Sequence, residues 1–133
     1  MDPSQFIRSV YLGDRACKSI IIDGWEAEVR VQLDCISRVR GETWNYYRDE
    51  DLVNGFIVFE GTKKIEWDPN GRIPNDAIIA LTFEPCSAEG AKYIFHIEIA
   101  SGDEKTGETV PVRIGILAEG IALQSREGVK IRD

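Results

Sequence analysis

Alternation of apolar and polar residues along several segments is the feature that most constrains the fold of this chain. Within residues 26–35, one face carries Ala27, Val29, Val31, Leu33 and Cys35. The opposite face carries Glu28, Arg30, Gln32 and Asp34. Residues 92–100 and 109–118 alternate in the same way. A period of two is typical of a half-buried antiparallel strand, so the chain is predicted to consist mainly of antiparallel sheet.

Shorter apolar segments bounded by turn residues predict the remaining strands, over residues 18–23, 56–60, 63–67, 78–84 and 121–124. Asp23-Gly24 predicts a two-residue hairpin turn between the first two strands. Short strands without alternating helices favour a mainly β fold, an antiparallel β-sandwich or curled sheet of about seven to eight strands. With 133 residues, the chain is predicted to form a single domain over residues 1–133.

One short N-terminal helix is predicted before the strands. Asp2 is a suitable N-cap, and Gln5 completes a capping box. The apolar stripe of this helix consists of Phe6, Ile7, Val10 and Tyr11. Gly13 is expected to end the helix. Because about three turns of helix are not stable alone in water, the stripe is expected to dock on the sheet.

Charge, hydropathy and cysteine content disfavour several classes of partner and location. The formal net charge is −7, which argues against nucleic acid and anionic membrane surfaces as partners and allows a cationic one. No apolar stretch approaches the ~20 residues that cross a bilayer, and the first residues lack the basic region of a signal peptide. Because Cys17, Cys35 and Cys86 show no C-x-x-C spacing, we expect reduced thiols in a cytoplasmic protein and no zinc site.

No residue pattern predicts catalysis, a metal or a cofactor. His96 is the single histidine, and alternation places it on the face opposite Phe95, so we expect it to face solvent. No nucleophile or metal motif surrounds it. Asp49 and Asp51 match the spacing of a calcium loop poorly. We therefore expect no catalytic residue, no metal and no cofactor.

The segment after the first long strand has the composition of a partner-binding surface. Its candidate residues are Trp44, Tyr46, Tyr47, Arg48, Asp49, Glu50 and Asp51. Trp, Tyr and Arg dominate binding hot spots because each covers a large area and keeps a polar group. The acids, together with Asp103 and Glu104, would steer a basic partner. The alternative that Trp44 and Tyr46 only cover the end of the sandwich stays open.

Three segments resemble a small family of uncharacterised bacterial proteins of about this length. The first is Phe6-Ile7-x-x-Val10-Tyr11-Leu12-Gly13-Asp14-Arg15-x-Cys17-x-x-Ile20; the others are residues 36–40 and 49–60. This resemblance implies a domain of unknown function and assigns no functional residue. In size, charge and architecture the chain is also similar to the acidic β-rich immunity proteins encoded beside bacterial toxins, an analogy that implies a basic protein as partner.

The leading hypothesis is a non-enzymatic cytosolic protein-binding domain, in its specific form an immunity protein that occludes a toxin through an acidic and aromatic surface. One alternative is a small-molecule binder or hydrolase with a pocket in a curled sheet, lined by rings such as Trp67, Tyr93 and Phe95 with His96 or an Asp at its mouth. Another is self-association through an open sheet edge.

Overall fold

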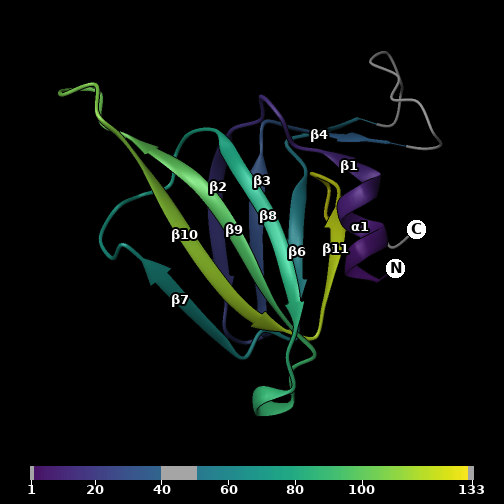
Figure 1. Ribbon diagram of the computed structural model, residues 1–133. Coiled ribbons are helices and arrows are strands. Elements are labelled where there is room, and N and C mark those ends of the chain that lie inside the picture. The colour runs from purple at the N-terminus through teal and green to yellow at the C-terminus, as the bar shows by residue number, and fades with distance from the viewer. Residues whose placement is uncertain (1, 40–50, 132–133) are drawn as a thin grey trace.

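The computed structural model describes residues 2–39 and 51–131 of the chain. Two antiparallel sheets lie face to face, a small third sheet extends beyond them, and one short helix lies at the side of the sandwich (Figure 1). The predicted mainly β architecture is confirmed, in its sandwich form. Within the described residues, no helix is long and apolar enough to cross a membrane.

The first sheet has four strands in the order β7-β10-β9-β8. They are β7 (Lys64–Asp68), β8 (Ile78–Pro85), β9 (Tyr93–Gly102) and β10 (Thr109–Ala118). The central pair, β9 and β10, is in register from Thr109↔Gly102 to Ala118↔Tyr93. A 3-10 turn, η1 (Ala88–Gly90), lies between β8 and β9. The strands β7 and β8 therefore form the two edges of this sheet.

The second sheet has five strands in the order β12-β11-β6-β3-β2. They are β2 (Cys17–Asp23), β3 (Glu28–Leu33), β6 (Phe56–Glu60), β11 (Gly120–Gln124) and β12 (Lys130–Ile131). The predicted hairpin of β2 and β3 is confirmed. The predicted two-residue turn is wrong, because Asp23 pairs with Glu28 and residues 24–27 form the connection.

A third, small sheet pairs β4 (Cys35–Arg38) with β1 (Val10–Tyr11) and β5 (Leu52–Val53). The prediction of one continuous strand over residues 26–35 is therefore wrong, since the chain changes sheets at Asp34. The Asp34 carboxylate accepts hydrogen bonds from the backbone N–H of Ala16 at 3.0 Å and of Cys35 at 2.8 Å. A short side chain that accepts backbone hydrogen bonds in this way competes with the hydrogen bonds between strands and favours a bend.

The core fills the space between the two large sheets and follows the predicted alternation. The residues that it buries most completely include Val31, Leu33, Ile57, Phe59, Phe95, Ile97, Ile99, Val112 and Ile116. The ring of Phe59 on β6 lies 5.3 Å from that of Phe95 on β9, between ring centroids. The two inner faces thus interdigitate as in other sandwiches.

The helix α1 (Pro3–Ser9) closes one side of the sandwich, between β8 and β11 (Figure 1). Its predicted capping box is confirmed, because Asp2 and Gln5 exchange hydrogen bonds at 2.9 and 3.2 Å. The prediction that it continues to Gly13 is wrong: Val10 and Tyr11 leave the helix and pair with β4. The side chain of Phe6 is fully buried in the core, so the helix is anchored by one aromatic ring.

A cluster of charged residues lies on the outer face of the five-stranded sheet. Glu28 and Glu60 are directly opposite each other on β3 and β6, an arrangement that is destabilising for like charges. Lys130, on the terminal strand β12, forms ion pairs with both carboxylates, with 3.0 Å between its Nζ and Oε2 of Glu60. The hydrogen bond to Glu28 is the main cause that raises the pKa of Lys130. This ammonium group therefore links β12 to the middle of the sheet.

Candidate functional site

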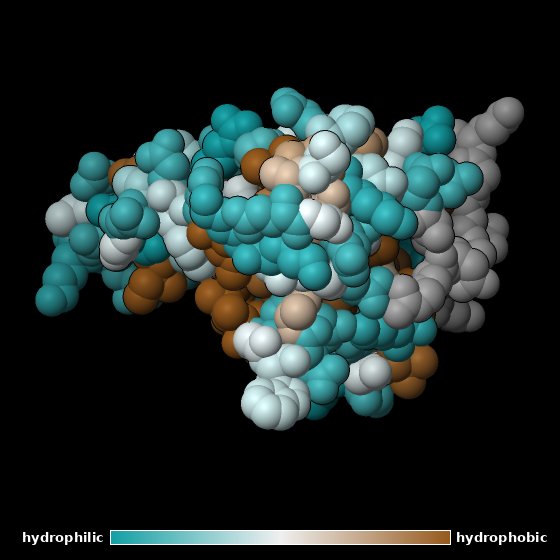
Figure 2. Space-filling view, turned by 90° about the horizontal axis from the view of Figure 1, so that it is seen from below, coloured by the Kyte–Doolittle hydropathy of each residue, from teal (hydrophilic) through white to brown (hydrophobic). Residues whose placement is uncertain are grey.

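The side of the sandwich opposite the helix is where apolar residues of the two inner faces reach the surface. We call this region the open end and define it by Ile22, Trp25, Val29, Thr62 and Ile65. It lies between the β2–β3 hairpin and the start of β7, at the lower left of Figure 1. Viewed from below, Figure 2 shows hydrophobic side chains exposed in a notch on this face.

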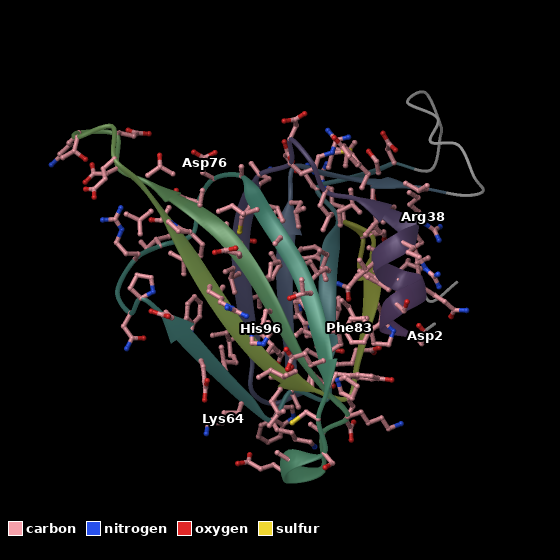
Figure 3. The ribbon with its side chains drawn as sticks, in the orientation of Figure 1. Asp2, Arg38, Lys64, Asp76, Phe83 and His96 are labelled. Atoms are coloured by element: carbon pink, nitrogen blue, oxygen red, sulfur yellow. The ribbon has the colours of Figure 1, made fainter. Side chains whose placement is uncertain are left out.

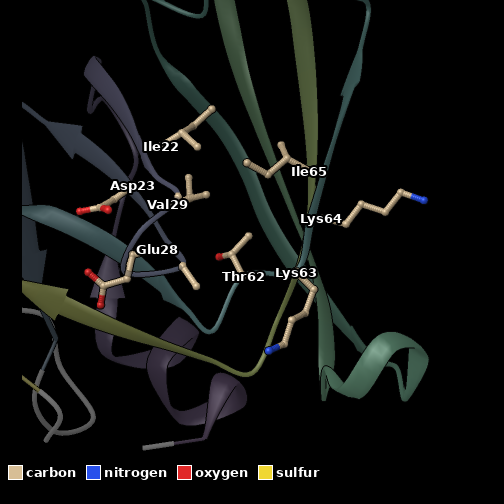
Figure 4. A pocket seen from close by; sticks show the side chains of 10 residues that line it. Ile22, Asp23, Glu28, Val29, Thr62, Lys63, Lys64 and Ile65 are labelled. Carbon is tan, nitrogen blue, oxygen red and sulfur yellow. The ribbon is translucent and has the colours of Figure 1, made fainter.

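A cleft of about 330 Å³ occupies the open end. Its lining consists of Ile22, Asp23, Gly24, Ala27, Glu28, Val29, Thr62, Lys63, Lys64 and Ile65. In Figure 4, Ile22 and Ile65 extend toward each other from opposite sides of this space. The cleft is wide and shallow, with an apolar interior between charged rims.

The registers of β2 and β7 explain why the walls of the cleft are apolar. Ile22 pairs with Val29, whose buried side chain shows that this face points into the sandwich. Ile65 pairs with the fully buried Ile116 of β10, so it also points inward. Nevertheless, Ile22 is 57% exposed. An inward-facing isoleucine is this accessible because β2 is the last strand of its sheet.

The floor of the cleft is the short connection from β6 to β7, which crosses from one sheet to the other. Thr62 donates its backbone N–H to the carbonyl of Ala27 at 2.8 Å, and its hydroxyl donates to the carbonyl of Phe59 at 3.0 Å. Lys63 donates its backbone N–H to the carbonyl of Leu117 at 2.7 Å. These bonds join the floor to both sheets, so the cleft is held by backbone structure.

The turn between β2 and β3 carries Trp25, whose side chain is 95% exposed. The carboxylate of Asp23 accepts the backbone N–H of Glu26 at 3.0 Å and an Arg30 guanidinium N–H at 3.3 Å. The hydrogen bond from Glu26, followed by that from Arg30, lowers the pKa of Asp23 against the opposing effect of desolvation. Ala27 closes the turn with a φ of 55°. The indole is therefore projected from an ordered turn.

Charge is distributed unevenly around the open end. Lys63 and Lys64 lie on the β7 side and are exposed, whereas Asp23 and the exposed Glu26 lie on the hairpin side. Lys64 is 3.9 Å from Glu66, with both side chains more than half exposed, so this ion pair contributes little to stability. One rim of the cleft is thus positive and the other negative.

Two edge strands border the open end. The register assigns β2 a single neighbour, β3, and β7 a single neighbour, β10, among the strands of residues 2–39 and 51–131. The outer N–H and C=O groups of such strands are available to pair with a further strand. A partner at the open end could therefore contact both apolar side chains and backbone groups.

Most of the predicted partner-binding segment lies outside the described residues. This applies to Trp44, Tyr46, Tyr47, Arg48, Asp49 and Glu50. Asp51 is described: it is half-buried and directly precedes β5. The predicted steering residues Asp103 and Glu104 lie in the β9–β10 connection, where they line a shallow hollow with Asp76 and Glu108. The partner-binding role of Trp44, Tyr46, Tyr47, Arg48, Asp49, Glu50 and Asp51 stays a prediction.

The aromatic residues that the sequence suggested as the lining of a small-molecule pocket do not form one in the structure. Phe95 is fully buried against Phe83 and Tyr93, with ring centroids 6.3 and 5.7 Å apart, so the rings fill the interior. His96 follows Phe95 on β9 and therefore lies on the outer face of the sheet, as predicted (Figure 3). The ring of His96 lies over Gly115 of β10.

Cys17, Cys35 and Cys86 are free cysteines in the structure. Cys17 is buried, and desolvation raises its pKa to about 11. Burial is also the largest cause that raises the pKa of Cys35, against an opposing effect of the Arg15 charge. In the described part of the chain, no three His, Cys, Asp or Glu side chains are grouped so that they could hold a metal ion.

Neither Trp25 nor the exposure of Ile22 was predicted from the sequence. A signal was present for Trp25, an aromatic residue that directly follows the turn pair Asp23-Gly24, and for Ile21, an apolar residue where alternation requires a polar one. The inward-facing Ile22 had no such signal. Apolar residues at a turn and on both faces of a strand indicate an exposed apolar patch.

Comparison with known protein families gives a match over the full chain. A family model described as "Family of unknown function (DUF6258)" matches residues 1–133. Searches of curated proteins and of solved structures gave no match. The fold and the open end are therefore the basis on which a function can be assigned.

Proposed function

Because the chain belongs to the DUF6258 family of unknown function, we propose its function from its geometry: it is a non-enzymatic protein-binding domain whose open end contacts the partner. The observation that carries this proposal is the exposure of Trp25 (95%) and Ile22 (57%) beside an apolar cleft. Tryptophan is among the residues that dominate binding hot spots.

Burial of these side chains supplies the favourable free energy of binding. Removing apolar surface from water contributes roughly 25 cal/mol per Å², and an ordered turn limits the conformational entropy that Trp25 loses on binding. An extended segment of the partner can also pair with β2 while its apolar side chains enter the cleft beside Ile65. The exposed Trp25, the edge strand β2 and the apolar cleft would therefore each contact a protein partner.

The charge of the molecule supports a basic partner. The net charge of −7 attracts a cationic protein over distances of about a Debye length, ~8–10 Å at physiological salt. In its specific form, the proposal is an immunity protein that blocks a basic toxin in the cytosol, with the predicted acidic and aromatic segment 44–51 as a second contact. The free thiols of Cys17, Cys35 and Cys86 support the cytosolic setting.

The volume of the cleft supports the alternative, a small-molecule binder. About 330 Å³ is at the low end of ligand pockets, which hold roughly 300–1,000 Å³. Native mass spectrometry of protein purified from its own host separates the two functions. A bound metabolite that is lost on substitution of Ile65 would favour the alternative.

The proposal is tested by partner capture with matched variants. Tagged protein is expressed in its native host as wild type, as Ile22→Ser/Trp25→Ala and as Val129→Ser, which removes another exposed apolar side chain (62%) on the β11–β12 turn. We expect a basic protein to bind the wild type and Val129→Ser, and to bind Ile22→Ser/Trp25→Ala with a Kd at least about 30-fold higher, since hot spots contribute about 2 kcal/mol or more.

Association with the purified partner should also slow with added salt. Equal affinity of the double variant and the wild type would contradict the role of the open end. Failure of both the wild type and Val129→Ser to retain any protein would contradict the binding function itself.

A further inference from the structure

The open end carries a protruding side chain and a recess next to each other. Trp25 projects from the β2–β3 turn and does not line the cleft of its own chain. We propose that the open ends of two copies of this chain bind each other, with Trp25 of each copy in the cleft of the other. The inference rests on the proposed binding role of the open end and names what occupies it when no partner is bound.

A two-fold axis accounts for the arrangement of apolar groups. In a symmetric pair, the same patch on both copies must be complementary to itself. A protrusion beside a recess meets this condition, because rotation by 180° places each protrusion over the other recess. The recess offers Ile22, Val29 and Ile65 as apolar walls, which is a suitable environment for an indole ring.

The same axis makes the charged rims complementary. Lys63 lies on the rim formed by the start of β7, and Glu26 lies on the rim formed by the hairpin turn. Both are exposed. Rotation about the axis exchanges the rims, so Lys63 of one copy faces Glu26 of the other, twice in each dimer. An arrangement that placed the two positive rims, or the two negative rims, opposite each other would be unfavourable because like charges repel.

The size of the contact implies weak association. A tryptophan buries about 150–250 Å², and the cleft wall loses a similar area, so two reciprocal insertions bury on the order of 600–1,000 Å² in total. Specific stable interfaces begin at about 1,200 Å². The dimer should therefore have a Kd on the order of 10–500 µM. At this affinity, the favourable free energy of surface burial is only slightly larger than the entropic cost of association. A tighter partner would displace the second copy.

Sedimentation velocity of the full chain, from roughly 5 to 500 µM to bracket that affinity, measures this association. We expect the wild type to shift from monomer to dimer with concentration. Trp25→Ala should remain monomeric, while Val129→Ser should behave as the wild type. Circular dichroism verifies that each variant is folded.

A charge exchange tests the symmetry. Lys63→Glu alone and Glu26→Lys alone each place like charges opposite each other and should weaken self-association about tenfold or more, since opposed like charges across an interface are strongly unfavourable. An equimolar mixture of the two variants should form a heterodimer with the wild-type affinity, because both rim contacts would then join a glutamate of one variant to a lysine of the other.

A wild type that stays monomeric at about 500 µM, a dimer that Trp25→Ala also forms, or single-charge variants that do not recover on mixing would each overturn the inference. None of these results depends on capture of a heterologous partner. The proposed function is therefore tested separately, by the capture experiment with Ile22→Ser/Trp25→Ala.

Discussion

At the scale of single residues, position in the sheets separates side chains that look alike in the sequence. Ile22 and Ile97 both point into the sandwich, but Ile22 is 57% exposed and Ile97 is fully buried. The difference arises because β9 has a neighbour on each side, whereas β2 is an edge. The edge position of β2 does not expose every side chain on it: Cys17, the first residue of the same strand, is buried, whereas Cys35 and Cys86 are partly exposed.

The burial of Cys17 predicts its reactivity. With a pKa of about 11, roughly one thiol in a thousand is ionised at pH 8, and only the thiolate reacts. Iodoacetamide should therefore modify Cys86 well before Cys17 in the folded protein, and both at similar rates in urea. Peptide mass spectrometry measures the two rates; equal rates in the folded protein would contradict the burial of Cys17.

The same shift has a consequence for stability. The folded state favours the neutral thiol, so the stabilisation is complete below the ordinary pKa of 9.0 and is lost as the pH rises from 9 toward 11. We expect the Tm of Cys17→Ala to decrease less than the Tm of the wild type over this pH interval. Thermal unfolding followed by circular dichroism at several pH values provides the measurement.

At the scale of elements, the β2–β3 hairpin shows how a turn sets the position of an exposed side chain. A two-residue turn formed by Asp23-Gly24 would make Trp25 part of a strand. The observed connection instead uses the Asp23 carboxylate as an acceptor and a left-handed residue, Ala27, at its end. Trp25 is thereby placed at the tip of the hairpin.

The left-handed conformation of Ala27 can be tested by substitution. An L-residue with side chain at φ 55° is less stable than glycine there by about 1–2 kcal/mol, which exceeds the ~0.5–1 kcal/mol of extra chain entropy that glycine loses. Ala27→Gly should thus raise the free energy of unfolding by about 0.5 kcal/mol.

The control for this prediction is Ala77→Gly. Ala77 is exposed, pairs with Ala16 and has no positive φ, so glycine should lower the stability there by about 0.5–1 kcal/mol. Chemical denaturation in urea measures both changes. A loss of stability in both variants would contradict the strain assigned to Ala27.

At the scale of the whole molecule, the two sides of the sandwich differ in how far they bury an aromatic side chain. The helix α1 covers one side with Phe6, which is fully buried. The opposite side presents Trp25, which is 95% exposed. The ring of Phe6 therefore belongs to the core, whereas the ring of Trp25 lies in solvent.

This difference predicts that two alanine substitutions change the free energy of unfolding by very different amounts. Phe6→Ala should lower the free energy of unfolding by about 3–5 kcal/mol, as for other buried phenylalanines. Trp25→Ala should change it by less than about 0.5 kcal/mol, as for surface residues, while weakening the proposed binding at the open end. Urea unfolding below about 5 µM, where the weak dimer is dissociated, measures both. A large loss of stability in Trp25→Ala would place its ring in the core.

The faces of the strands follow from the sequence alone, because alternation is a local property that each strand expresses wherever it pairs. The buried series of β9 and β10, the capping box of α1 and the outward position of His96 are all confirmed on this basis. The break at Asp34 and the early end of the helix at Ser9 were missed, since both depend on hydrogen bonds to residues distant in the chain, such as Ala16 and Ser37.

The order of the strands was decided only by the tertiary structure. Alternation specifies which side chains of β2 face inward but not whether another strand will lie beside it. Sheet order arises from pairing between segments far apart in the chain, as between β6 and β11, and no local pattern encodes it. The open end consists of what that order leaves uncovered, and for this reason its cleft became visible only when Ile22 and Ile65 were placed opposite each other in space.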